Sequence, residues 1–123
     1  MSQPVAIPGQ IVDLHLAKPS AENRLTVLVK TPDVEIIQLS IPAGSKIPTY
    51  EAEGEIILQC LEGRVALTVL GEFHELKAGQ LLYLAQNEPF SMQGLERASV
   101  LTTIIARKQG PNVELIGKHT PGR

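Results

Sequence analysis

The side chains of this sequence that could do chemistry lie in its middle third. Glu51, Glu53 and Glu55 alternate with other residues, so in an extended chain their carboxylates project to one side and could recruit a cation. Tyr50 precedes them and supplies a phenol, and His74 supplies an imidazole further along. The imidazole and the phenol could also work together as an acid/base couple. The residue types therefore leave open a cation site and metal-free proton transfer.

These residues also have ordinary structural explanations. Three alternating glutamates are typical of a solvated strand edge that discourages aggregation, and a strand histidine usually lies at the surface or is satisfied in the core. Cys60, the only cysteine, has the same strand parity as Ile56 and Leu58, so we expect a small buried apolar side chain and not a nucleophile. The chain contains no Gly-x-Gly-x-x-Gly, no phosphate loop and no Gly-x-Ser-x-Gly, which leaves nucleotide binding and serine hydrolysis without support.

Length and charge narrow the class of protein. A chain of 123 residues predicts one domain, 1–123, with a single core. The formal net charge of −2 offers no electrostatic footprint for nucleic acid or an anionic membrane. No run approaches the roughly 20 apolar residues of a membrane span, and residues 1–9 lack the pattern of a signal peptide. We therefore expect a cytoplasmic protein that binds neither nucleic acid nor membrane.

The apolar pattern predicts short strands separated by Gly and Pro turns, with almost no helical period. The expected strands cover residues 24–30, 34–41, 55–61, 65–69, 73–76, 80–84 and 99–106, and a weaker early strand covers 11–16. Residues 1–10 are expected to be a loose N-terminal arm and 109–123 a flexible C-terminal tail. Many short strands of this kind indicate an all-β sandwich or barrel.

Residues 41–63 resemble the first motif of the cupin superfamily, the RmlC-like proteins. That motif reads Gly, five residues, His-x-His, three residues, Glu, six residues, Gly, and Gly44 and Gly63 fall into its register. The metal-ligand positions are changed. The two histidine positions and the glutamate position are held by Tyr50, Ala52 and Ile56.

The second cupin motif aligns independently of the first. Its pattern is Gly, five residues, Pro-x-Gly, two residues, His, three residues, Asn, and Gly79 opens it. Ala85, Asn87, Phe90 and Gly94 then stand where the family has Pro, Gly, His and Asn, in that order. Asn87 is a sensible replacement for glycine, because asparagine tolerates a left-handed backbone better than most residues.

The resemblance implies an all-β, cupin-type double-stranded β-helix, which is a jelly-roll barrel. It also implies that the metal ligands have been replaced, so we expect no metal and no other cofactor. If the aligned side chains point inward, the interior is apolar with a single hydroxyl, which suits a small organic ligand. The residues expected to line such a pocket are Tyr50, Ala52, Ile56, His74, Phe90 and Met92. In the alternative, Ile56, Phe90 and Met92 simply fill the barrel as core.

Three functions remain open from the sequence. The first is a metal-free small-molecule-binding or accessory protein. The second is an enzyme, either metal-dependent through His74 and the three glutamates or a metal-free isomerase that uses His74 and Tyr50; its catalytic residues are otherwise unknown. The third is a structural partner protein with a filled barrel. Cupins commonly pair through their sheets and exchange N-terminal strands, so the resemblance also implies a homodimer, with residues 11–16 available for the exchange.

Overall fold

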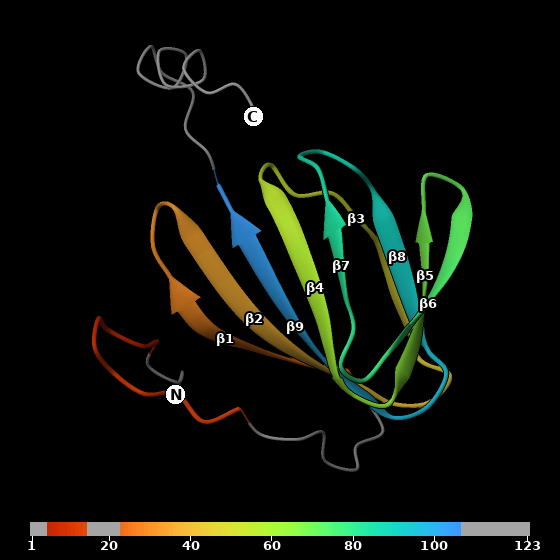
Figure 1. Cartoon of the computed structure of the whole chain (residues 1–123), viewed down its shortest axis with the longest axis horizontal. Helices are drawn as coiled ribbons and strands as arrows, with labels where there is room; N and C mark the ends of the chain where they lie inside the picture. The colour runs from red at the N-terminus through yellow and green to blue at the C-terminus, as the bar shows by residue number, and fades with distance from the viewer. Residues whose placement is uncertain (1–4, 15–22, 107–123) are drawn as a thin grey trace.

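The computed structural model describes residues 5–14 and 23–106, and this part of the chain forms nine strands and no helix (Figure 1). The strands are β1 (Arg24–Lys30), β2 (Val34–Ile41), β3 (Lys46–Tyr50), β4 (Glu55–Glu62), β5 (Arg64–Val69), β6 (Glu72–Lys77), β7 (Leu81–Leu84), β8 (Phe90–Gly94) and β9 (Ala98–Ile105). The prediction of an all-β fold is therefore confirmed.

The strands form two antiparallel sheets that enclose the core between them. The larger sheet has the order β1-β2-β9-β4-β7 and the smaller one the order β3-β8-β5-β6. Strands distant in the sequence are therefore neighbours, most notably β9, which pairs with β2 on one side and β4 on the other. This is the jelly-roll arrangement that the cupin resemblance implied.

Strand β4 shows how the sequence pattern becomes a layer of the barrel. Ile56, Leu58 and Cys60 face inward and are 1%, 0% and 2% exposed, because alternate residues of a strand point to the same side. On the outward side, Ile57 and Leu61 are only half-buried. The continuous apolar run had predicted a strand covered on both sides, whereas within the described chain its outer side is only partly covered.

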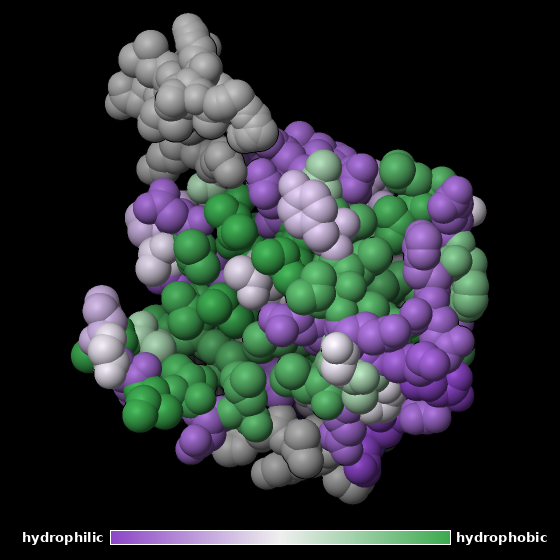
Figure 2. Space-filling model, in the orientation of Figure 1, coloured by the Kyte–Doolittle hydropathy of each residue, from purple (hydrophilic) through white to green (hydrophobic). Residues whose placement is uncertain are grey.

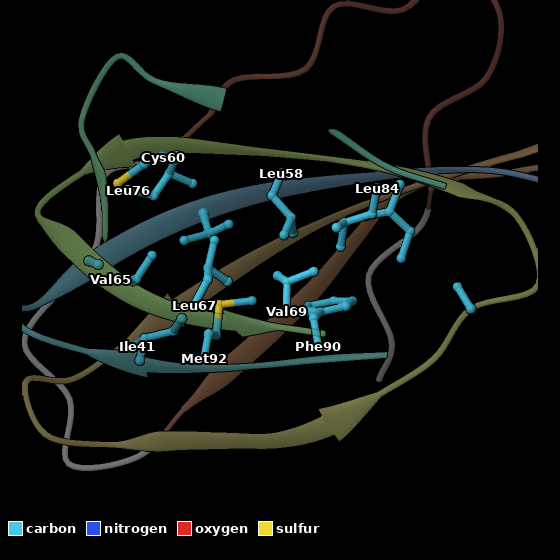
Figure 3. Packing of buried hydrophobic residues seen from close by; sticks show 14 of the residues in the cluster. Ile41, Leu58, Cys60, Val65, Leu67, Val69, Leu76, Leu84, Phe90 and Met92 are labelled. Atoms are coloured by element: carbon cyan, nitrogen blue, oxygen red, sulfur yellow. The ribbon is translucent and has the colours of Figure 1, made fainter. Parts of the chain in front are cut away.

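The two sheets share one apolar core (Figure 3). Its buried members are Ile41, Ala52, Ile56, Leu58, Cys60, Val65, Leu67, Val69, Leu76, Leu84, Phe90, Met92, Ala98, Val100 and Ile104. Side chains from both sheets interdigitate in the close-up, as expected for a small barrel that is filled by its own residues. Burying each larger aliphatic or aromatic side chain contributes about 1.5–3 kcal/mol to folding.

The turns use residues that accept a left-handed backbone. Leu70 and Gly71 have φ of 51° and 81° and form the two-residue connection between β5 and β6, as in a type I′ hairpin. Asn87 has φ of 64°, which confirms the prediction made from its place in the second motif. Gly63 combines φ of 78° with a close approach to the carbonyl oxygen of Arg97, so a side chain has neither the conformation nor the space it needs there.

The N-terminal prediction is partly wrong. Residues 11–14 lie in no strand, and residues 15 and 16 fall outside the described chain. Ala6 contacts β1, where its amide donates a hydrogen bond to the Leu28 carbonyl over 2.9 Å, and the Gln10 amide closes a turn by donating to the Ile7 carbonyl over 3.1 Å. The predicted tail at 109–123 also lies outside the described residues. No helix long and apolar enough to cross a membrane occurs in the part of the chain that the structure describes.

Candidate binding site at one end of the barrel

Three of the four aligned metal-ligand positions belong to the packed core. Ala52, Ile56 and Phe90 are 5%, 1% and 4% exposed, and Met92 beside them is 3% exposed. Figure 3 shows Phe90 and Met92 directed into the space between the sheets, against Val69 and Leu67. The residues at these positions therefore work as core side chains, which is the alternative that the sequence left open.

These positions do not fit the transition metal that the cupin fold usually holds. Such a metal needs about three converging nitrogen, oxygen or sulfur ligands. Ala52, Ile56 and Phe90 offer none, and Tyr50 offers a single phenol oxygen, so these positions supply at most one ligand. Across residues 5–14 and 23–106, no group of three His, Cys, Asp or Glu side chains is placed to hold a metal ion.

Tyr50 lies at the rim of the core and not inside it. Its ring meets that of Phe90 edge to face, with centroids 5.9 Å apart and an interplanar angle of 81°. The two residues also pair across β3 and β8. Tyr50 is 46% exposed, so its ring covers Phe90 while much of the side chain stays in solvent.

His74 has the predicted strand parity but not a buried position. It pairs with the core residue Leu67, yet its side chain is 43% exposed and its Nε2 lies 3.9 Å from Oε1 of Glu72. Tyr50 and His74 lie on β3 and β6, the opposite edges of the smaller sheet, about 14 Å apart at three strand spacings. The structure therefore does not bring the two together as an acid/base couple.

The three glutamates do not share one face of a strand. Only Glu55 belongs to a strand, where it begins β4 half-buried, while Glu51 and Glu53 are exposed in the bend that joins β3 to β4. The alternation expected for an extended chain is lost in this bend.

Cys60 is buried, as its strand parity predicted. Its Sγ lies 3.4 Å from the carbonyl oxygens of Glu62 and Gly63 and donates weakly to them. Burial is the main reason why the pKa of this thiol is raised above its ordinary value, and the nearby carboxylate of Glu62 adds to the effect. The thiol is thus held neutral, which makes it a poor nucleophile.

A hollow of about 500 Å³ opens where β1 turns into β2 and β9 ends, at the upper end of the larger sheet in Figure 1. Its lining residues are Lys30, Thr31, Pro32, Val34, Glu35, Ile104 and Ala106. Ile104 connects the hollow to the barrel, because it is 7% exposed, belongs to the core and pairs directly with Ile56. The hollow therefore adjoins the region to which the cupin motifs had pointed.

The polar groups of the hollow form one ion pair at its edge. Nζ of Lys30 lies 3.5 Å from Oε2 of Glu35, with side chains 62% and 27% exposed. Thr31 is engaged in the turn, since its hydroxyl accepts hydrogen bonds from the amides of Asp33 and Val34. The apolar surface of Ile104 thus lies beside an ammonium and a carboxylate that can exchange partners with solvent or a ligand.

Thr102 places a hydroxyl inside the barrel near this end. It is 5% exposed and pairs with Ile37 on one side and Leu58 on the other. Its Oγ1 is buried and makes no hydrogen bond to any described residue. A buried hydroxyl without a partner costs about 1–3 kcal/mol. Thr102 lies one inward position along β9 from Ile104 but does not itself line the hollow.

None of the six residues proposed from the sequence lines this hollow, so their contact with a ligand stays a prediction. The lining residues that the sequence reasoning missed include Lys30, Glu35 and Ile104. The parity of Thr102 and Ile104 along β9 was visible in the sequence. What was not visible is that the ends of β1, β2 and β9 meet.

Comparison with known proteins gives a fold but no close relative. No family model and no curated protein matches the sequence. A conserved protein of unknown function from Streptococcus pyogenes superposes with a TM-score of 0.74 at 17% identity, over 89% of this chain and 97% of that one. A cupin superfamily protein from Desulfitobacterium hafniense superposes with a TM-score of 0.70 at 17% identity, over 73% of this chain and 83% of that one. An RmlC-like cupin from Desulfovibrio desulfuricans superposes with a TM-score of 0.68 at 18% identity, over 79% of this chain and 98% of that one.

These likenesses cover most of each chain and agree with the strand order of the two sheets. Gly44, Gly63 and Gly79, which fall into the register of the two motifs, have positive φ of 80°, 78° and 90°. The chain is a small domain with the cupin jelly-roll fold.

Proposed function

We propose that this protein binds a small organic molecule at the end of its barrel, without a metal. The observation that carries the proposal is the hollow whose floor, Ile104, is also part of the core and lies next to Ile56. Concave sites that combine apolar walls with a few polar groups are the usual form of small-molecule sites. The volume of about 500 Å³ suits a ligand of moderate size.

The lining indicates the class of ligand. An apolar group would contact Ile104 and Ala106, and an acidic group would meet the ammonium of Lys30 at the edge. Glu35 opposes a carboxylate ligand, because the two negative charges repel each other and compete for the same ammonium. The ligand class that fits is a small carboxylic acid with an apolar body.

Thermal shift and calorimetry with short-chain and aromatic carboxylic acids test this proposal. Lys30→Gln is expected to weaken binding of the best acid by about fivefold, since one partly exposed ion pair is lost. Glu35→Gln is expected to strengthen binding by a similar factor, about fivefold, because it removes a competing carboxylate. Lys77→Gln, which changes an exposed lysine at the end of β6 on the other sheet, is the matched control and should bind as the wild type does. If no acid shifts the unfolding midpoint, or if the two lysine variants behave alike, the proposed site is wrong.

The outer face of the larger sheet favours a second function, that of an accessory protein that acts as a homodimer. Two neighbouring rows of this face contain no charged side chain. The rows read Leu81, Gln59, Leu101, Gln38 and Tyr83, Ile57, Thr103, Ile36. Leu81 and Tyr83 are 59% and 56% exposed, Gln38 is 7% exposed and the other five residues are half-buried. Figure 2 shows the hydrophobic surface over these strands. Exposed apolar areas of this kind are typical of interfaces.

A second copy of the chain is the partner that this face fits. Two such faces can meet about a two-fold axis without bringing like charges together, because their central rows are neutral. Leu81→Glu is expected to convert a dimer to a monomer, since it places two carboxylates in one apolar interface. Leu70→Glu is the control, because Leu70 is 66% exposed but lies in the β5–β6 turn of the other sheet.

Light scattering at micromolar concentration measures the result. A monomeric wild type, or a dimer that survives Leu81→Glu as well as it survives Leu70→Glu, would contradict the dimer through this face.

A further inference from the structure

The outer face of the smaller sheet has a composition unlike that of the larger one. Its strands align in two neighbouring rows of outward side chains, because the residues between them, Leu67 and Met92, belong to the core. One row reads Lys46, Gln93, Ala66, Glu75, and the next reads Ser91, Thr68, Phe73. This face therefore combines hydroxyl, amide and ammonium groups with one aromatic ring.

A groove of about 430 Å³ follows these rows across the sheet. Its lining residues are Lys46, Ile47, Pro48, Thr49, Ala66, Thr68, Phe73, Ser91, Met92 and Gln93. Small residues make the floor: Ala66 is only 7% exposed although it points outward, and Ser91 is half-buried. Phe73 stands at one end with 67% of its surface exposed. The groove spans strands β3 to β6, which is about 14 Å at three strand spacings.

The charges of the groove are unequal at its two ends. At the β6 end, Arg64 is shared by two carboxylates, since its Nη1 lies 2.6 Å from Oε2 of Glu75 and its Nε lies 2.9 Å from Oε2 of Glu96, so this group of three keeps a negative charge. At the β3 end, the side chain of Lys46 is exposed and forms no ion pair with a described residue. The groove thus has an uncompensated positive charge at the end opposite Phe73.

This combination is the chemistry that a sugar chain requires. The apolar face of a pyranose ring stacks on an exposed aromatic ring such as Phe73, and its hydroxyls exchange hydrogen bonds with neutral side chains such as Thr68, Ser91 and Gln93. A peptide strand would find fewer partners. The floor strands β5 and β8 are interior strands whose backbone groups are already paired on both sides.

We propose that the outer face of the smaller sheet binds a short oligosaccharide that carries a carboxylate. One ring stacks on Phe73, the middle of the chain lies over Ala66 and Ser91, and the carboxylate meets Lys46. The site lies on a different sheet from the hollow beside Ile104 and can be occupied independently of it.

Titration of the isotope-labelled protein with trigalacturonic acid, followed by amide NMR, tests the proposal. The amide shifts are expected to concentrate at Lys46, Ala66, Thr68, Ser91 and Gln93. The neutral trisaccharide cellotriose should bind several-fold more weakly, and hexaglutamate should not shift these amides. Lys77→Gln, which changes an exposed lysine of the same sheet that does not line the groove, should leave the titration unchanged.

Two variants with one control separate stacking from charge. Phe73→Ala is expected to weaken trigalacturonate binding about tenfold, because the stacked ring is lost. Lys46→Gln should remove the preference for the acidic over the neutral trisaccharide. Leu70→Ala is the control: Leu70 is 66% exposed beside the same hairpin but does not line the groove, so its variant should bind as the wild type.

Several results would overturn the proposal. Absence of shifts at the groove, equal affinity of Phe73→Ala and Leu70→Ala, or shifts centred on Lys30 and Ile104 each count against it. Hexaglutamate binding as well as trigalacturonate would show that the groove selects acidic chains by charge alone and is not a sugar site.

Discussion

Phe90→Ala is expected to lower the free energy of unfolding by about 3–5 kcal/mol. The sequence resemblance aligns Phe90 with a metal-binding histidine of the second cupin motif. Its ring is 4% exposed and packs in the core beside Val69 and Met92. Removing the ring would leave a cavity that the two sheets cannot close, because each strand is held by its neighbours. Urea unfolding monitored by circular dichroism measures the change.

Phe73→Ala is the matched control for this experiment. These are the only two phenylalanines of the chain, and Phe73 is 67% exposed on the outer face of β6. Its replacement should change the free energy of unfolding by less than about 0.5 kcal/mol. If Phe90→Ala costs as little as Phe73→Ala, the interior at Phe90 is an open pocket and not a filled core.

Gly63→Ala is expected to destabilise the protein by about 3–4 kcal/mol. A methyl group there must adopt a left-handed backbone conformation and also meets the carbonyl oxygen of Arg97 and the Cα of Ala98. Both contacts are with backbone atoms at the start of β9, a central strand, so they cannot move aside cheaply. Thermal and urea unfolding of the variant give the size of the loss.

Gly71→Ala separates the two contributions. Gly71 has a similar φ of 81°, but a methyl group there meets nothing within 4 Å. This variant should lose only the conformational part, about 1 kcal/mol. Equal losses for the two variants would show that the close approach of Arg97 does not matter for stability.

The sequence specified the strands that have two-residue periodicity and a long apolar run. The bounds of β1 and β2 were predicted at residues 24–30 and 34–41, and those of β9 to within one residue, since alternation and flanking turns both marked them. β3 and β8 were not recognised as strands, because β3 contains Pro48 and β8 mixes Ser91 and Gln93 with apolar residues. Proline is tolerated in β3 because β3 lies at the edge of its sheet.

The site was less predictable than the fold. Motif alignment correctly indicated which positions face the barrel at Ala52, Ile56 and Phe90, because the spacing of turn glycines fixes the register of the strands between them. It could not indicate the hollow beside Ile104 or the groove at Phe73. Both arise where strands from distant parts of the sequence become neighbours. The local pattern of residues along the chain does not indicate which strands will pair.

The position of β9 has a consequence for how the chain folds. β9 is made after every strand it joins, yet it separates β2 from β4 in the larger sheet. Until residues 98–105 are available, β2 and β4 each have an unpaired edge, and the sheet cannot close in the order of synthesis. The core between the two sheets therefore cannot be completed until β9 pairs with β2 and β4. Because these pairings join residues far apart in the sequence, we expect slow folding, on the scale of milliseconds to seconds.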